Sequence, residues 1–173
     1  MTELPKRKPN RLAGYDYSKN GAYFVTICVK GRHEILCAIA TDECNETRTA
    51  IVGANCVRPQ LTDIGKIVDS EIKQLSKTYT GVSVDCFVVM PNHIHMIILI
   101  LDETGQIQFA PTVSRIIKQW KGSVTKKIGY SIWQKSFHDH IIRNEEDYYQ
   151  ISEYINNNPV NWKEDCFYNE VKT

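Results

Sequence analysis

Two histidines one residue apart, His93 and His95, lie inside the most apolar run of the chain, residues 88–101. Because side chains on a strand alternate between the two faces of a sheet, residues i and i+2 share a face. The two imidazoles would project side by side, with Cα atoms roughly 6–7 Å apart at about 3.3 Å rise per residue. This spacing lets them hold one metal ion; the alternative is two histidines with ordinary hydrogen-bond partners. Pro91 cannot donate a ladder hydrogen bond, so it belongs at a strand start or bulge, which places the histidines near an accessible end of the sheet.

A metal site needs at least a third ligand, and the C-terminal part of the chain offers one. A helix there places Tyr154 and Asn158, four residues apart, on the same face, with Gln150 one turn earlier. An amide oxygen is a reasonable hard ligand for a divalent ion that also binds phosphate oxygens. A phenol with a pKa near 10 is a weak nucleophile alone, but it can attack a phosphodiester polarised by a metal. In the alternative interpretation, Tyr154 is a core aromatic residue and Asn158 a C-terminal cap.

The elements that position these residues follow from the period of the apolar positions. Apolar residues at three- and four-residue steps predict helices, with Thr62 or Asp63 and then Asn144 as N-caps and a stop before Pro159. These helices span residues 62–79, 112–128 and 144–158. β-Branched and aromatic runs predict strands over residues 22–29, 82–89, 95–101 and 132–142.

Two connections between the strands are harder to assign. Residues 35–40 and 49–52 are expected to pair as a hairpin across residues 41–47. The stretch 90–92 is too short to demand a full turn, so the strands on either side of it could form one bent strand. The order of elements predicts an α+β protein with an antiparallel sheet and helices packed on it.

Composition indicates an ordinary globular protein. The 173 residues are 24% charged and 42% hydrophobic, with a net charge of +1. No apolar run reaches the 18 or more residues of a membrane span. The basic N-terminus has no apolar segment behind it, which argues against a secretory signal and predicts a cytoplasmic protein without a membrane partner. Six cysteines without a C-x-x-C pair are expected to be free thiols, several of them in strands.

Local basic clusters are more informative than the net charge. One basic cluster lies near the N-terminus and consists of Lys6, Arg7, Lys8 and Arg11. Arg115, Lys118 and Lys121 lie with Lys126 and Lys127 on the second helix, away from its apolar stripe. Both clusters are compatible with contacts to DNA phosphates, and a solvated helix face is the alternative.

Five sequence blocks occur in the order typical of a known family. They are Arg11–Tyr17, Gly21–Cys28, Val89–His95, Ile132–Asn144 and Glu153–Pro159. Together they resemble the single-tyrosine HUH transposases, most closely their REP-associated subgroup, from about Arg11 to Val160.

The resemblance implies a ferredoxin-like α+β domain over residues 21–160, preceded by a basic arm over 1–20 and followed by a tail over 161–173. It also implies a transposase that acts on single-stranded or hairpin DNA with a divalent metal, Mg²⁺ or Mn²⁺.

In that family the H-x-H pair binds the metal, which matches His93 and His95. The nucleophile is the tyrosine of the last helix, which matches Tyr154. A Gln or Asn one turn later completes the metal site, which matches Asn158. The tyrosine attack leaves a 5′-phosphotyrosine link and a free 3′-OH, and the reverse attack rejoins strands.

Other interpretations remain open at this stage. The sequence contains a second H-x-H pair, His138 and His140. We interpret His138 as incidental and His140 as a helper or structural residue. The alternative is that this second pair binds the metal. A domesticated hairpin-binding protein without cleavage activity would show the same sequence blocks. A metal-dependent hydrolase in which Tyr154 is only a core residue is a third hypothesis. Monomer and homodimer are both compatible with the sequence.

Overall fold

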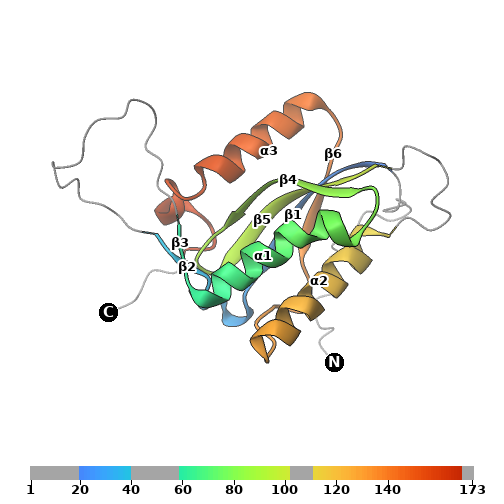
Figure 1. Cartoon of the computed structure of the whole chain (residues 1–173). Helices are drawn as coiled ribbons and strands as arrows, with labels where there is room; N and C mark the ends of the chain where they lie inside the picture. Colours follow the sequence, from blue (N-terminus) through green and yellow to red (C-terminus); the bar gives the residue numbers. More distant parts are fainter. Residues whose placement is uncertain (1–19, 40–58, 102–110, 169–173) are drawn as a thin grey trace, which may run out of the picture.

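A four-stranded antiparallel sheet in the order β4-β5-β1-β6 forms the centre of the molecule (Figure 1). The computed structural model describes residues 20–39, 59–101 and 111–168. The strands are β1 Gly21–Cys28, β2 Cys37–Ala38, β3 Gln60–Leu61, β4 Val82–Val89, β5 His93–Ile100 and β6 His138–Ile142. The helices are α1 Asp63–Thr78, α2 Val113–Ile128 and α3 Glu145–Asn157, with 3₁₀ turns η1 Lys30–Arg32 and η2 Trp162–Glu164. The order β1-α1-β4-β5-α2-β6 with this sheet order is a ferredoxin-like fold, as expected.

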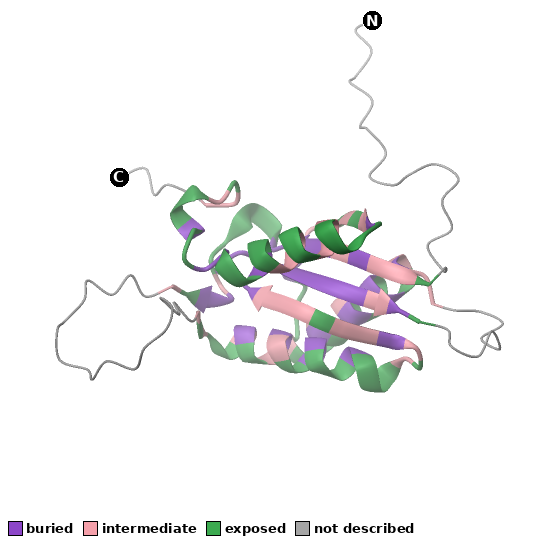
Figure 2. Ribbon diagram, turned by 90° about the horizontal axis from the view of Figure 1, so that it is seen from above, coloured by how far each residue is buried: buried purple, intermediate pink, exposed green. Residues whose placement is uncertain are grey.

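The two faces of the sheet are covered differently. Helices α1 and α2 lie against one face, and α3 lies across the other (Figure 1). The larger core cluster joins α1 and α2 to alternate residues of β1 and β5, such as Val25 and Met96. On the α3 face the buried apolar residues are Ile97, Ile142 and Ile155. Figure 2 shows the central strands as the buried layer, with the outward faces of the helices exposed.

The helices and β1 lie within one or two residues of their expected positions. The first difference from the prediction concerns the strands on either side of residues 90–92. They form an antiparallel hairpin, not one bent strand, because Val89 pairs with Ile94 and the pairing continues along both strands. The amide of Met90 donates to the carbonyl of His93 at 2.9 Å, which closes the turn. Pro91 lies in this turn, where its missing N–H costs no ladder bond.

Two further strand predictions change. Cys37–Ala38, in the segment before residue 40, pair with Gln60–Leu61. The expected partner, residues 49–52, lies outside the described residues. The last strand covers only His138–Ile142 of the expected 132–142, because Trp133 makes a single bridge to Val29 and the chain then leaves the sheet.

The cysteines in the described part of the chain are free thiols. Cys28, Cys37 and Cys86 lie in strands, as expected, and Cys166 lies near the C-terminus. Every helix among the described residues is too short or too polar to cross a bilayer.

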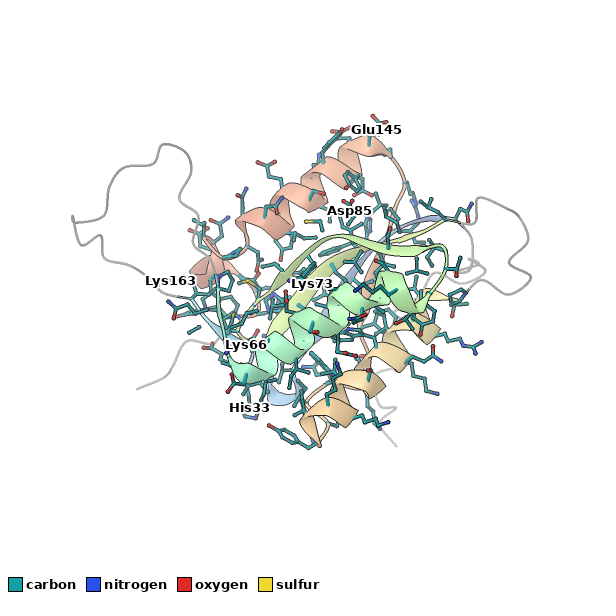
Figure 3. All side chains as sticks on the ribbon, in the orientation of Figure 1. His33, Lys66, Lys73, Asp85, Glu145 and Lys163 are labelled. Atoms are coloured by element: carbon teal, nitrogen blue, oxygen red, sulfur yellow. The ribbon has the colours of Figure 1, made fainter. Side chains whose placement is uncertain are left out.

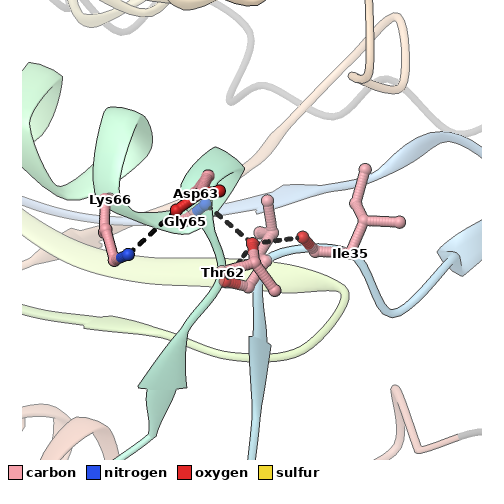
Figure 4. A network of polar contacts seen from close by, with 6 residues as sticks. Ile35, Thr62, Asp63, Gly65 and Lys66 are labelled. Carbon is pink, nitrogen blue, oxygen red and sulfur yellow. Dashed lines mark hydrogen bonds and ion pairs between the residues drawn. The ribbon is translucent and has the colours of Figure 1, made fainter.

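The start of α1 is fixed by Thr62 (Figure 4). Its hydroxyl accepts a hydrogen bond from the amide of Gly65 at 3.0 Å and donates to the carbonyl of Ile35 at 2.7 Å. The backbone amide of Thr62 donates to the carbonyl of Leu36 at 3.0 Å. The helix is thereby held directly against the segment that precedes β2.

This close approach predicts a large effect of Gly65→Ala. A Cβ at Gly65 would lie 1.9 Å from the carbonyl oxygen of Leu36, so backbone must move. We expect the variant to lose about 2 kcal/mol of stability or more, because overpacking against backbone outweighs the better helix propensity of alanine. Gly122→Ala in α2 is the matched control, since its Cβ would meet nothing within 4 Å. Urea denaturation of both variants checks the prediction; equal stability would contradict it.

Candidate metal and tyrosine site

Strand pairing brings His93 and His95 to one end of the sheet, on the face covered by α3. In β5 they alternate with Ile94 and Met96, which belong to the larger core on the opposite face. The two Nε2 atoms face each other at 2.9 Å. The shared face predicted from the i, i+2 spacing is therefore confirmed.

The outer nitrogens of both imidazoles are held by neighbouring side chains. His93 Nδ1 lies 2.9 Å from Asn92 Oδ1, while the Asn92 amide donates to the carbonyl of Phe167 at 2.8 Å. Since an amide oxygen can only accept, His93 Nδ1 carries the proton and its Nε2 presents a lone pair. His95 Nδ1 lies 2.8 Å from the hydroxyl of Thr26, its neighbour on β1. Such second contacts orient metal-ligating histidines in proteins.

Helix α3 brings Tyr154 to the same place. Its hydroxyl lies 3.2 Å from His95 Nε2 and donates to Asp165 Oδ2 at 3.2 Å. Its ring packs edge-on against Phe24, with ring centroids 6.1 Å apart. The side chain is 42% exposed, so Tyr154 is not the core aromatic residue of the alternative interpretation. Tyr148 and Ile151 on the same helix pack on the apolar cluster instead.

One turn after Tyr154, Asn158 faces the site from the end of α3. Its amide nitrogen donates to Asp165 Oδ2 at 2.7 Å. Its Oδ1 is buried and has no hydrogen-bond partner among the described residues. Gln150, the amide one turn before Tyr154, bonds Glu146 and is exposed.

Sequence reasoning missed Asp165. It lies just after η2, in a stretch without a recognisable motif, and its carboxylate accepts hydrogen bonds from Tyr154 and Asn158. His93, His95 and Asp165 are the one group of three metal-ligating side chains found among the described residues, with ligand atoms within 4.8 Å of one another.

The segment around Asp165 also covers the histidines. The rings of Trp162 and Phe167 lie 5.9 Å and 4.5 Å from the ring of His93, and Arg32 lies over Phe167 at 5.2 Å. His93 and His95 are consequently 0% and 1% exposed. The expectation that these histidines lie at an accessible sheet end is wrong for this arrangement, because aromatic packing closes that end.

Burial decides the charge states in the site. It lowers the pKa of His93 to about 4, with Asp165 opposing and Arg32 adding to the shift. Burial and the neighbouring His93 also lower the pKa of His95 well below its usual value. Both imidazoles are therefore neutral at pH 7 and can offer lone pairs.

The donor set fits a divalent metal ion. Two neutral imidazole nitrogens point at each other, a carboxylate lies beside them, and the buried Asn158 Oδ1 has no hydrogen-bond partner in the part of the chain that the structure describes. Nitrogen and oxygen donors of this kind suit Mn²⁺ and, with more oxygen ligands, Mg²⁺. No equivalent group forms around the second H-x-H pair in the described structure: His138 is exposed, and His140 bonds Asp147 at 2.9 Å.

The basic residues on α2 are not equivalent. Arg115 and Lys118 are exposed, whereas Lys121 is partly buried and its ammonium donates to the carbonyls of Gln134 and Ser136 at 2.9 Å and 2.8 Å. The structure therefore gives Lys121 a structural role between α2 and the segment before β6. Lys6, Arg7, Lys8 and Arg11 lie outside the described residues.

The Tyr154 hydroxyl should respond to the charge of Asp165. Burial raises the pKa of Tyr154, and the Asp165 charge and hydrogen bond raise it further. Asp165→Asn removes that charge, so we expect the pKa of Tyr154 to fall but to stay above its ordinary value because burial remains. Tyrosine-labelled NMR titration of the metal-free protein measures the shift.

Asp85→Asn is the matched control for this titration. The hydrogen bond from Tyr148 to Asp85 is the main cause of the raised pKa of Tyr148. The control should lower the pKa of Tyr148 and leave that of Tyr154 unchanged. A Tyr154 pKa that stays constant or rises in Asp165→Asn would contradict the described contact.

The chain is similar to proteins of known sequence and structure. No family model matches the chain. An uncharacterised protein of Haemophilus influenzae is 30% identical, over 94% of this chain and 93% of that protein. The REP-associated tyrosine transposase of Escherichia coli is 28% identical, over 83% of this chain and 69% of that protein. A solved structure of a REP-associated tyrosine transposase bound to a REP hairpin has a TM-score of 0.59 at 22% identity, covering 94% of this chain and 74% of that one.

These likenesses define the class first. The named sequence relatives and the shared fold place the chain among the tyrosine transposases. Within them, relatives that are named REP-associated tyrosine transposase and are 25% and 28% identical place it in the REP-associated subgroup.

Proposed function

We propose that the protein is a metal-dependent enzyme that nicks and rejoins single-stranded DNA at hairpins through a 5′-phosphotyrosine intermediate. The observation that carries the proposal is the Tyr154 hydroxyl, 3.2 Å from the Nε2 of one of two facing histidines. A nucleophile held this close to a metal-binding nitrogen is the arrangement that tyrosine attack on a phosphodiester requires. The solved relative bound to a REP hairpin supports hairpin DNA as the substrate class.

His93 and His95 would hold the metal through their Nε2 atoms, with Asn158 Oδ1 and the Asp165 carboxylate as oxygen donors. The chemistry that a bound divalent ion supplies here is polarisation of the phosphodiester oxygens. Thr26 and Asn92 keep the two rings in the orientation that aims Nε2 into the site.

Tyr154 carries out the covalent step. Its oxygen forms a bond to the phosphorus while the bond from phosphorus to the 3′ oxygen breaks, which leaves a 5′-phosphotyrosine and a free 3′-OH. The phenolic proton is hydrogen-bonded to Asp165 Oδ2 at 3.2 Å, so Asp165 is placed to accept it, and the departing 3′ oxygen gains a proton. Rejoining is the reverse attack by a 3′-OH, which returns the proton to the tyrosine.

Basic side chains would hold the DNA backbone. We assign this role to the arm residues Lys6, Arg7, Lys8 and Arg11 and to the exposed Arg115 and Lys118. The sequence groups Lys121 with them, but its bonds to two carbonyls favour a role in holding α2 to the segment before β6 rather than a phosphate contact.

A salt titration tests the α2 contacts. Each lost phosphate contact should shallow the slope of log affinity against log salt by about 0.7 for single strands, so Arg115→Ala with Lys118→Ala should shallow it by about 1.4. Lys66→Ala with Lys73→Ala is the charge-matched control: both lie along α1 (Figure 3) and pair with Asp63 and Asp69. Equal slopes for the two double variants would mean that the α2 residues only face solvent.

The direct test of the enzyme is a covalent adduct. The protein would be incubated with Mn²⁺ or Mg²⁺ and a labelled hairpin DNA taken from beside its gene, with a single-stranded flank. We expect a denaturation-resistant protein–DNA adduct and a released strand ending in 3′-OH. Binding without an adduct would instead identify a hairpin-binding protein without cleavage activity.

A further inference from the structure

A cavity of about 450 Å³ lies between α2 and the segment that leads into β6, apart from the histidines and Tyr154. Its lining includes the apolar side chains of Ile117 and Phe137 and the ammonium groups of Lys118 and Lys135. Lys118 and Lys135 are exposed, and Phe137 is half-buried against the larger core. The cavity therefore has apolar walls and cationic groups on the solvent side.

One wall of this cavity is fixed in place. Lys121 crosses from α2 and donates to the carbonyls of Gln134 and Ser136, which tethers the strand-entry segment to the helix. Burial lowers the pKa of Lys121 to about 8, which agrees with an ammonium that serves the protein rather than a ligand. The carboxylate oxygens of Asp139 are buried, so the accessible charge is that of Lys118 and Lys135.

The cavity lies at the same end of the sheet as the tyrosine. Phe137 directly precedes His138, which pairs with Thr26, and Thr26 pairs with His95. Two strand spacings of about 4.8 Å thus separate the start of β6 from the metal-ligand strand. The cavity opens on the face of the sheet that α2 covers, whereas Tyr154 lies on the α3 face. Because β6 is an edge strand, a DNA strand engaged at Tyr154 would reach the cavity by passing around this edge.

We propose that this cavity binds one unstacked nucleotide of the single-stranded DNA on which the enzyme acts. The half-buried ring of Phe137 provides the apolar surface on which a base can stack, with the buried Ile117 behind it, and Lys118 and Lys135 provide the cations that a flanking phosphate needs. This inference rests on the proposed function, since it names a second contact for the same substrate. It gives Phe137 and Lys135 a specificity role without any part in the covalent step.

The test is a binding measurement with the full-length protein. The probe is the fluorescent hairpin DNA with a single-stranded flank, and each flank nucleotide is replaced in turn by an abasic residue. We expect one position at which loss of the base weakens wild-type binding about tenfold, as base stacking on an aromatic residue suggests. Phe137→Leu, which keeps apolar volume and the fold, should weaken binding of intact DNA similarly and remove the sensitivity at that one position.

Lys135→Ala and the control Lys126→Ala complete the design. Lys126 is exposed on α2 but does not line the cavity. Lys135→Ala should weaken binding several-fold and Lys126→Ala should not, while both form the tyrosine adduct at saturating DNA. If Phe137→Leu and Lys135→Ala bind and respond to abasic sites as Lys126→Ala does, the cavity is not a nucleotide site, although the adduct still supports the enzyme. If the wild-type protein neither binds this DNA nor forms an adduct, the proposed function and this inference fail together.

Discussion

Replacing Tyr154 with phenylalanine is expected to abolish the covalent protein–DNA adduct and to reduce strand cleavage by at least about 1,000-fold, because the variant lacks the attacking oxygen. The change removes one oxygen and almost no volume, so the ring contacts with Phe24 and His95 remain. Unfolding free energy should change by no more than about 1 kcal/mol, the usual value of a hydrogen bond. Gel analysis after denaturation, with a thermal melt of the same sample, measures both quantities.

Two other tyrosines on the same helix serve as controls for Tyr154→Phe. Tyr149 is 67% exposed, and Tyr148 donates to Asp85. Tyr149→Phe and Tyr148→Phe should form the adduct at the wild-type level. An adduct that survives Tyr154→Phe, or a nucleotide mapped to Tyr148 or Tyr149, would show that the nucleophile has been assigned to the wrong residue.

Removal of His95 should have the second largest effect. His95→Ala deletes one of two facing nitrogens, so we expect Mn²⁺ affinity to fall by at least about 100-fold and cleavage to be lost. Because His95 is buried beside Thr26, the alanine variant also leaves a cavity and a hydroxyl without its partner. His95→Gln keeps a polar group there and separates loss of metal from loss of fold.

The second H-x-H pair provides the matched control for His95. His138 is exposed and lies outside the group of metal-ligating side chains. Calorimetric titration with Mn²⁺ should find wild-type affinity for His138→Ala and a clearly weaker affinity for His95→Gln, whose amide oxygen replaces the imidazole nitrogen. The opposite pattern would move the metal to His138 and His140.

The parts of the fold that the sequence predicted are those set by short-range patterns. The apolar period placed α1, α2 and α3, and Thr62 and Asn144 cap their helices as expected. The shared face of His93 and His95 follows from strand geometry alone. The pairing of Cys37 with Leu61 was not predicted from the sequence. Two-residue strands carry almost no periodic signal, and tertiary contacts determine which strand they pair with.

Asp165 shows why the site could only be predicted in part. It lies 70 residues from His95 in sequence, and its position depends on Trp162 and Phe167 packing against His93. No local sequence pattern predicts such a long-range contact. Tyr154 and Asn158, in contrast, could be placed on one helix face because they are four residues apart. The cavity between α2 and β6 could not be predicted either, because it lies between elements that only the fold brings together, with Lys121 donating to two backbone carbonyls across it.

The unequal cores on the two sides of the sheet bear on how the molecule opens. Few buried apolar residues hold α3, whereas α1 and α2 share the large cluster on the other face. Segments with few buried contacts open locally at a lower free energy than the whole domain unfolds. We therefore expect the helix that carries Tyr154 to open locally at a lower free energy than the sheet that carries His93 and His95.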